Sequence, residues 1–243
     1  MIKKLVCIYT CEADKDDMLF IENTDWYHDT IRSSDSKIIK VLASPYVSTS
    51  KLEGDTLWVH APESYSTLSL KTYAMISACV ELLDFQYLIK VDSSLTRYKP
   101  RSYRQALTFE NFIKNFYKED FYQEYNGLFK IESSSADLGK WAKLRGLDNF
   151  DLDKLSDKNV PDWFCGKCYV IEREVAEFIS SNGGKCAEDH ANFLGGSEDL
   201  MVGKMYSIYK DDDLFGNSVN LESSEEVISY ANKNLDEEGI IYD

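Results

Sequence analysis

The alternation of apolar and polar segments along the first ninety residues predicts an α/β fold. Short apolar runs recur, and turn residues or amphipathic stretches separate them. Buried strands that alternate with helices are typical of a mainly parallel sheet covered by helices. The strands are expected at residues 3–10, 37–43, 56–60 and 86–91, and the helices at residues 15–32 and 64–84.

The helix expected over residues 64–84 has the clearest pattern. Ser64 precedes it and is the candidate N-cap, because its hydroxyl can accept a hydrogen bond from a free backbone N–H. Lys71 lies off the apolar stripe, where a solvated surface lysine is the usual outcome. The stripe itself consists of Tyr73, Ile76, Val80 and Leu83, which fall at helical spacing.

The second half of the chain is less regular, and we interpret the whole chain as a single domain. A polar connection is expected over residues 133–161, and a weak helical pattern begins at residue 222. The loop at residues 194–197 should precede the last clear helix. Helices are expected at residues 108–118, 172–182 and 198–209, and strands at residues 128–132 and 165–171.

The charge of the chain bears on its partners. The formal net charge is −15 over 243 residues, whereas binding to nucleic acid depends on neutralising phosphates with Lys and Arg. We therefore expect no nucleic-acid partner. One short basic cluster suits a small anionic ligand better, and it consists of Arg97, Lys99, Arg101 and Arg104.

The six cysteines and the first residues indicate a cytosol-like compartment. Cys165 and Cys168 have the spacing of half a zinc site, but no second pair follows, so buried structural thiols are the simpler interpretation. The apolar run near Met1 is too short for a signal segment or a membrane span. We expect reduced thiols, a cytoplasmic location and no membrane span.

Two acidic positions are candidates for chemistry. Asp92 follows the strand at residues 86–91, and ligands of open α/β sheets bind beyond the carboxyl ends of strands. A carboxylate there can hold a divalent metal that neutralises a diphosphate, although Asp followed by Ser also favours a simple turn. Glu198 and Asp199 open a helix after a Gly-Gly-Ser loop, where capping by acidic side chains is the alternative.

Three further positions have both a structural and a functional interpretation. Trp163 is an aromatic that, if exposed, can stack on a sugar ring, but core packing is more common. Gly166 lets the backbone approach a ligand closely, or marks a bulge. Lys90 alternates with apolar neighbours and so can point into a polar site. The phosphate-binding loops of dinucleotide and P-loop folds and the G-x-S-x-G elbow are absent from the sequence.

Four segments in order resemble the beta-1,3-galactosyltransferase/Fringe family. Residues 63–72 are similar to that family's D-S-Y-x-N-L-T-L-K-T, and residues 87–94 take the place of a strand ending in K-x-D-D-D. Residues 161–170 are similar to P-x-Y-x-x-G-x-G-Y-V-x-S. Residues 198–203, E-D-L-M-V-G, match E-D-V-x-V-G closely.

The resemblance covers about residues 1–209 and implies a GT-A fold and glycosyl transfer. Residues 1–107 would form the nucleotide-sugar-binding half, residues 108–209 the acceptor and catalytic half, and residues 210–243 a tail. The implied activity moves a sugar from a nucleotide diphosphate sugar, UDP-linked in that family, to a hydroxyl of a glycan or glycolipid acceptor with inversion. A lipid-linked acceptor is compatible with peripheral membrane association.

The resemblance also implies roles for individual residues. Asp199 matches the catalytic base. Asp92 matches the first acid of the metal motif and would contact Mn²⁺ or Mg²⁺. The implied nucleotide-sugar-binding residues are Lys71, Lys90, Asp92, Ser94 and Arg97; the implied acceptor-binding residues are Trp163, Gly166 and Glu198, with Tyr169 in the same segment as Gly166.

The departures from the family pattern leave an alternative open. The metal motif reads Asp-Ser-Ser, so its last acid is replaced by Ser94, and Lys and Arg would have to neutralise the leaving diphosphate if no metal binds. The absence of a membrane anchor in this sequence suits a bacterial or viral enzyme. The alternative is a non-catalytic GT-A-like module that binds a nucleotide sugar or a glycan.

Overall fold

A computed structural model describes residues 1–93, 124–127, 130–131, 142–143, 150–151 and 163–212. The strands are β1 (Ile2–Tyr9), β2 (Ser36–Ala43), β3 (Lys51–Glu53), β4 (Thr56–Val59), β5 (Phe85–Asp92), β6 (Tyr125–Gly127), β7 (Lys130–Ile131), β8 (Trp163–Phe164) and β9 (Cys168–Glu172). The helices are α1 (Lys15–Glu22), α2 (Asp25–Arg32), α3 (Leu68–Leu82), α6 (Arg173–Asn182), α7 (Gly184–Phe193) and α8 (Glu198–Asp212), with 3₁₀ turns η1 (Glu12–Asp14) and η2 (Tyr65–Thr67).

The main sheet is mixed, with a parallel centre. Its strand order is β3-β4-β2-β1-β5-β9-β6. Strands β4, β2, β1 and β5 pair in parallel, whereas β3 runs antiparallel to β4, and β9 runs antiparallel to both β5 and β6. The α/β prediction is confirmed, and parallel pairing holds for the central strands only.

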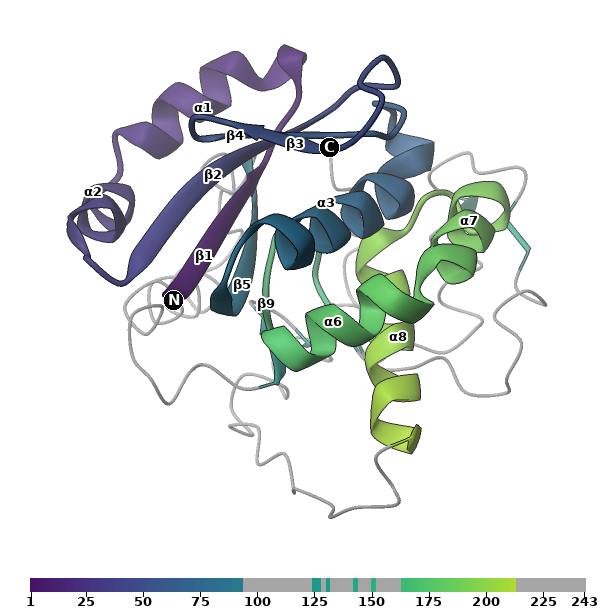
Figure 1. Ribbon diagram of the computed structural model, residues 1–243. Helices are drawn as coiled ribbons and strands as arrows, with labels where there is room; N and C mark the ends of the chain where they lie inside the picture. The colour runs from purple at the N-terminus through teal and green to yellow at the C-terminus, as the bar shows by residue number, and fades with distance from the viewer. Residues whose placement is uncertain (94–123, 128–129, 132–141, 144–149, 152–162, 213–243) are drawn as a thin grey trace, which may run out of the picture.

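Helices cover both faces of the sheet, as Figure 1 shows, with α1 and α2 on one side and α3, α6, α7 and α8 on the other. Alternate residues of β1 explain why: Val6 and Ile8 pack with α1 and α2, whereas Leu5, Cys7 and Tyr9 pack with α3. Each buried aliphatic side chain contributes about 1.5–3 kcal/mol to stability. A strand that is apolar on both faces therefore takes the centre of the sheet.

The helix expected over residues 15–32 is two helices. The side chains of Asn23 and Thr24 donate hydrogen bonds to the carbonyls of Leu19 and Ile21, at 2.6 Å each. Such side chains compete with the backbone ladder. Thr24 is extended, with φ −87° and ψ 147°, and α2 begins after it.

Other predicted ends of helices and strands also differ from those in the structure. Ser64 does not cap α3, since its hydroxyl bonds the hydroxyls of Ser66 and Thr67 instead of a backbone N–H. The strand expected from residue 165 begins at Cys168, whose N–H closes a turn on Cys165. Helix α7 and strand β3 were not predicted. Residues 108–118 and the tail from residue 222 lie outside the described residues.

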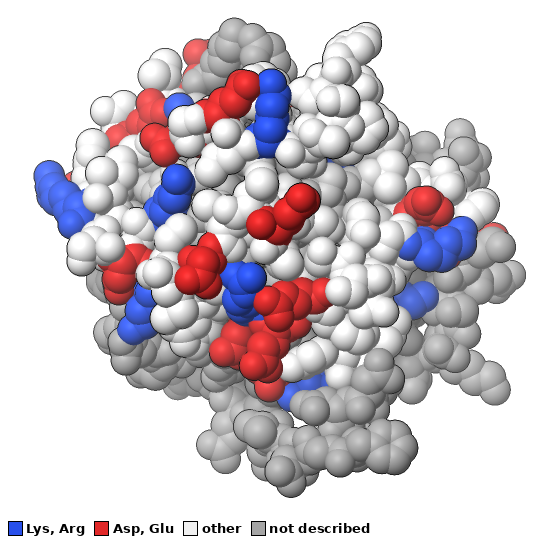
Figure 2. All heavy atoms as spheres, in the orientation of Figure 1, with Lys and Arg blue, Asp and Glu red and all other residues white. Residues whose placement is uncertain are grey.

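Charged side chains of both signs are interspersed on the face in Figure 2. Among the residues described there, basic side chains form no continuous area of the kind that binds a polyanion backbone. Many of the lysines are paired instead, such as Lys185 with Asp189 at 2.8 Å. Exposed pairs of this kind contribute little to stability.

Candidate active site at the carboxyl edge of the sheet

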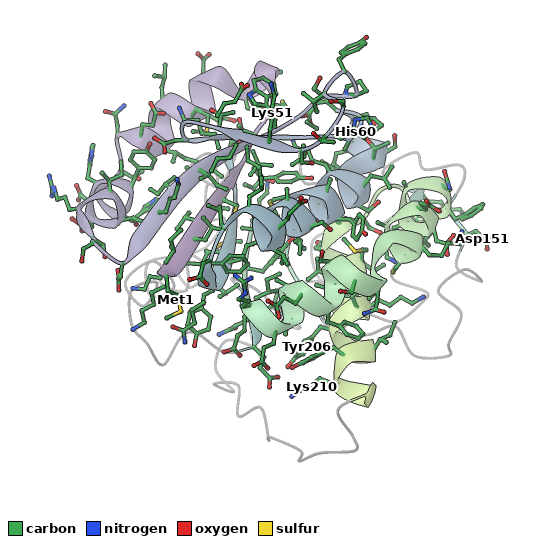
Figure 3. The ribbon with its side chains drawn as sticks, viewed as in Figure 1. Met1, Lys51, His60, Asp151, Tyr206 and Lys210 are labelled. Atoms are coloured by element: carbon green, nitrogen blue, oxygen red, sulfur yellow. The ribbon has the colours of Figure 1, made fainter. Side chains whose placement is uncertain are left out.

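The sheet reverses its direction of winding between β1 and β5. From β1 the chain continues to β2 on one side, and later enters β5 on the other side of β1. Ligands of open α/β sheets bind at such switch points, beyond the carboxyl ends of the strands. That edge lies opposite Met1 and on the side of His60 in Figure 3. Tyr9 and Asp92 are the paired last residues of the two strands.

Lys71 points from α3 into this edge, so the alternative of a solvated surface lysine is wrong. Its side chain is 2% exposed. Its Nζ donates to the carbonyl of Thr10 at 2.6 Å and to both carboxylate oxygens of Glu63 at 2.8 Å. Burial lowers the pKa of Lys71, and Glu63 opposes that change. Lys71 therefore holds Glu63 against the end of β1.

Lys90 makes the corresponding contact from β5. Its Nζ donates to the Gly166 carbonyl and, at 2.8 Å, to Oε1 of Glu198. Burial alone would lower the pKa of Lys90, but the charges of Glu198 and Asp92 raise it above its usual value. Buried pairs like this one are costly to break, since removal of one partner leaves an uncompensated charge.

The ring of Tyr9 is shared by the two lysines. The Nζ atoms of Lys71 and Lys90 lie 4.4 and 4.7 Å from its centroid, within cation–π range. The Tyr9 hydroxyl donates to the carbonyl of Leu68 at 3.0 Å and accepts from Thr72 at 3.1 Å. Two ion pairs, Glu63–Lys71 and Lys90–Glu198, are thus fixed around one aromatic ring.

Asp199 lies in the first turn of α8. Its Oδ2 accepts the backbone N–H of Gly166 at 3.1 Å, and its Oδ1 accepts the N–H of Leu200 at 2.9 Å. Burial, and then the neighbouring charge of Glu198, raise the pKa of Asp199 to about 7. A partly buried carboxyl that titrates near neutrality can accept a proton from a ligand.

Gly166 is required by the acids beside it. A Cβ at this position would lie 2.6 Å from Oε1 of Glu198. Its carbonyl accepts from Lys90 and its N–H donates to Asp199. The structure shows a close approach of Glu198 to the Gly166 backbone, whereas an approach of this backbone to a ligand stays a prediction. Glu198 itself is 6% exposed and paired with Lys90. Little of its surface is therefore open to direct contact with an acceptor substrate.

The surroundings of Asp92 do not fit a divalent cation. Its Oδ2 lies 3.9 Å from Nζ of Lys90 and 3.8 Å from Nζ of Lys167, so two ammonium groups already face it. The hydroxyl of Ser93 donates to Asp14. Among the described residues, no three His, Cys, Asp or Glu side chains gather closely enough to hold a metal ion.

Trp163 is a core residue, which corrects its interpretation as an acceptor platform. Its side chain is 5% exposed and packs with Leu194 and Leu200. An aromatic ring enclosed by apolar neighbours has no free face for a sugar. Tyr169 is also fully buried and packs beside Tyr125. Ser94, Arg97, Arg101 and Arg104 lie outside the described residues.

The cysteines beside the site are thiols. Cys165 and Cys168 are free, and burial raises the pKa of Cys165 to about 12. Such thiols stay protonated at neutral pH and are poor nucleophiles and ligands. The same edge contains three residues that sequence reasoning did not single out: Tyr9, Glu63 and Lys167. Tyr9 ends an apolar run in the sequence. Its position between Lys71 and Lys90 can be recognised only from the order of strands in the sheet.

Comparison of the sequence with models of known families and with curated proteins gives no match. No helix among the described segments is both long and apolar enough to cross a membrane. The fold that these residues establish is an α/β protein with a mixed seven-stranded sheet between two helical layers.

Proposed function

We propose that this protein is an inverting glycosyltransferase of the GT-A type, with Asp199 as the general base. One observation carries the proposal: a carboxyl with a pKa of about 7 is fixed by two backbone N–H groups beside the switch point of the sheet. The resemblance of residues 198–203 to the family's E-D-V segment supports the same assignment.

The proposed reaction is a single displacement. The acceptor hydroxyl oxygen attacks the anomeric carbon of the donor, its proton moves to Asp199, and the bond from the anomeric carbon to the diphosphate breaks. A base with a pKa near the working pH is the most effective one. Glu198 raises the pKa of Asp199, and Lys90 holds Glu198 in place, so both are positioning residues.

The leaving nucleoside diphosphate requires positive charge. Lys71 and Lys90 are buried and ion-paired. They would stabilise the diphosphate through the positive electrostatic potential that they create, without contacting it directly. Lys167 lies beside Asp92 with 23% of its side chain exposed. We assign Lys167 the direct contact with the diphosphate, because a fixed cation there stabilises the charge that develops on the leaving group.

A second candidate is a non-catalytic module of the same fold that binds a nucleotide sugar. The pairing of Asp92 with two lysines favours it, because this donor set does not fit the metal that the resemblance implies. The two candidates share a ligand and differ in turnover.

Turnover and binding together test the proposal. Wild-type protein is incubated with a panel of nucleotide sugars with Mn²⁺ or with EDTA, and its thermal shift and release of nucleoside diphosphate are measured. A ligand at 100 times its dissociation constant adds about 2.7 kcal/mol of stability. A shift that survives EDTA is expected.

Replacement of Asp199 tests its role as the base, and turnover of the wild type separates the two candidates. Asp199→Asn should lower turnover about 100- to 10,000-fold, since the base is lost, while the thermal shift with donor persists. Asp189→Asn on the surface of α7, where Asp189 pairs with Lys185, is the matched control and should keep full turnover. Binding without turnover in the wild type would favour the module.

A further inference from the structure

Glu63 is a fixed carboxylate at the carboxyl edge with no assigned task beyond its pairing. Its Oε2 accepts the backbone N–H of Ala43 at 3.0 Å, and Lys71 donates to both of its oxygens. Ala43 is the last residue of β2, and Lys71 also contacts Thr10, just beyond β1. The ends of two neighbouring strands therefore set the position of this carboxylate.

The carboxylate of Glu63 retains capacity to accept hydrogen bonds. Its side chain is 30% exposed, whereas Lys71 is 2% exposed. A carboxylate offers about four acceptor positions, and two donor groups contact this one, so a ligand can reach the exposed side. Because the group is already ordered, a ligand that binds to it loses little additional freedom.

The sign of the charge decides what Glu63 recognises. A carboxylate repels a phosphate and accepts hydrogen bonds from hydroxyl groups. In dinucleotide-binding α/β folds, an acidic side chain binds the ribose hydroxyl in this way. Asp199 is held beyond β5, and Glu63 is held at the ends of β1 and β2, with Tyr9 and the two lysines between them.

We propose that Glu63 binds a ribose hydroxyl of the nucleotide donor, which places the nucleoside on the β2 side of the site and the transferred sugar on the β5 side. This inference rests on the proposed function, since it requires a nucleotide ligand. The competing explanation is that Glu63 only neutralises Lys71.

The test compares ribose with its deoxygenated form. Wild-type protein should bind uridine diphosphate about 10- to 100-fold tighter than its 2′,3′-dideoxy form, because a hydrogen bond to a charged group is lost. In Glu63→Gln the ratio should fall about tenfold. Dissociation constants are measured by calorimetry. Glu53→Gln, which alters the exposed Glu53–Lys51 pair, is the matched control and should keep the wild-type ratio.

A double variant controls for the loss of stability that an unpaired Lys71 would cause. Glu63→Ala with Lys71→Met removes both charges together, so that no buried ammonium is left unpaired, and the ratio should approach one. Equal affinities for the two nucleotides in the wild type, or an undiminished ratio in the double variant, would overturn the inference while the proposed function stands. Failure of folded wild-type protein to bind uridine diphosphate or any nucleotide sugar of the panel would remove both.

Discussion

At the scale of single residues, Gly166 shows how the site depends on close packing. Its backbone contacts Lys90 and Asp199 through its carbonyl and N–H, and the carboxylate of Glu198 occupies the space that a side chain would need. Gly166 thereby helps to fix the positions of Lys90, Glu198 and Asp199. A substitution there tests packing without altering any charge.

We expect Gly166→Ala to lower the free energy of unfolding by about 1–3 kcal/mol, since a Cβ 2.6 Å from Glu198 overpacks the site. Denaturant titration measures the change. Gly184→Ala, where the nearest atom would be the Tyr73 hydroxyl at 3.3 Å, is the control and should stay within about 0.5 kcal/mol of wild type. Equal stability of the two variants would show that Glu198 moves aside freely.

At the scale of elements, apolar periodicity predicted β1, β2, β4, β5, α3, α6 and α8 to within a few residues, because burial of one or both faces determines these elements. Helix α7 was missed because its sequence, GKCAEDHANF, buries only Ala187 and His190 and has little apolar pattern. Candidate residues were found where they follow a strand or open a helix, as with Asp92 and Asp199. The position of Glu63 depends on its contacts with Ala43 at the end of β2 and with Lys71. The pattern of residues along the sequence does not show such contacts between distant segments.

His190 on α7 makes stability depend on pH. Its Nδ1 contacts the carbonyl and hydroxyl of Ser197 at 3.0 and 3.1 Å, and burial lowers its pKa to about 4. Because the unfolded chain binds the proton more readily, stability should fall as the pH is lowered from about 6.5 to 4. His190→Asn should flatten this part of the profile in thermal melts at a series of pH values. An unchanged slope would contradict the neutral, buried state of His190.

At the scale of the whole molecule, the stability profile combines opposite trends. The pKa of Asp199 is raised from 3.8 to about 7, so its contribution to stability is present below pH 3.8 and is lost as the pH rises to about 7. The contribution of His190 runs in the other direction over a similar range. The two contributions offset each other in the wild type.

Separate removal of the two groups should reveal each trend. Relative to wild type, the free energy of unfolding of Asp199→Asn should rise as the pH is raised from about 4 to 7. That of His190→Asn should fall relative to wild type over the same range. Chemical denaturation of both variants at matched pH values measures the slopes. Slopes of the same sign in both variants would rule out the assignment for one of the two groups.

The pairing of Lys90 with Glu198 also has a consequence for how the chain folds. The two residues are 108 positions apart, and Ser69 bonds the carbonyl of Ala187 across 118 positions. Contacts of such sequence separation form slowly, because the intervening chain must be closed first. Until α8 docks, Lys90 has no Glu198 to neutralise it. Site assembly should therefore coincide with completion of folding, so a chain that stops before α8 would lack the Lys90–Glu198 pair and the carboxylate of Asp199.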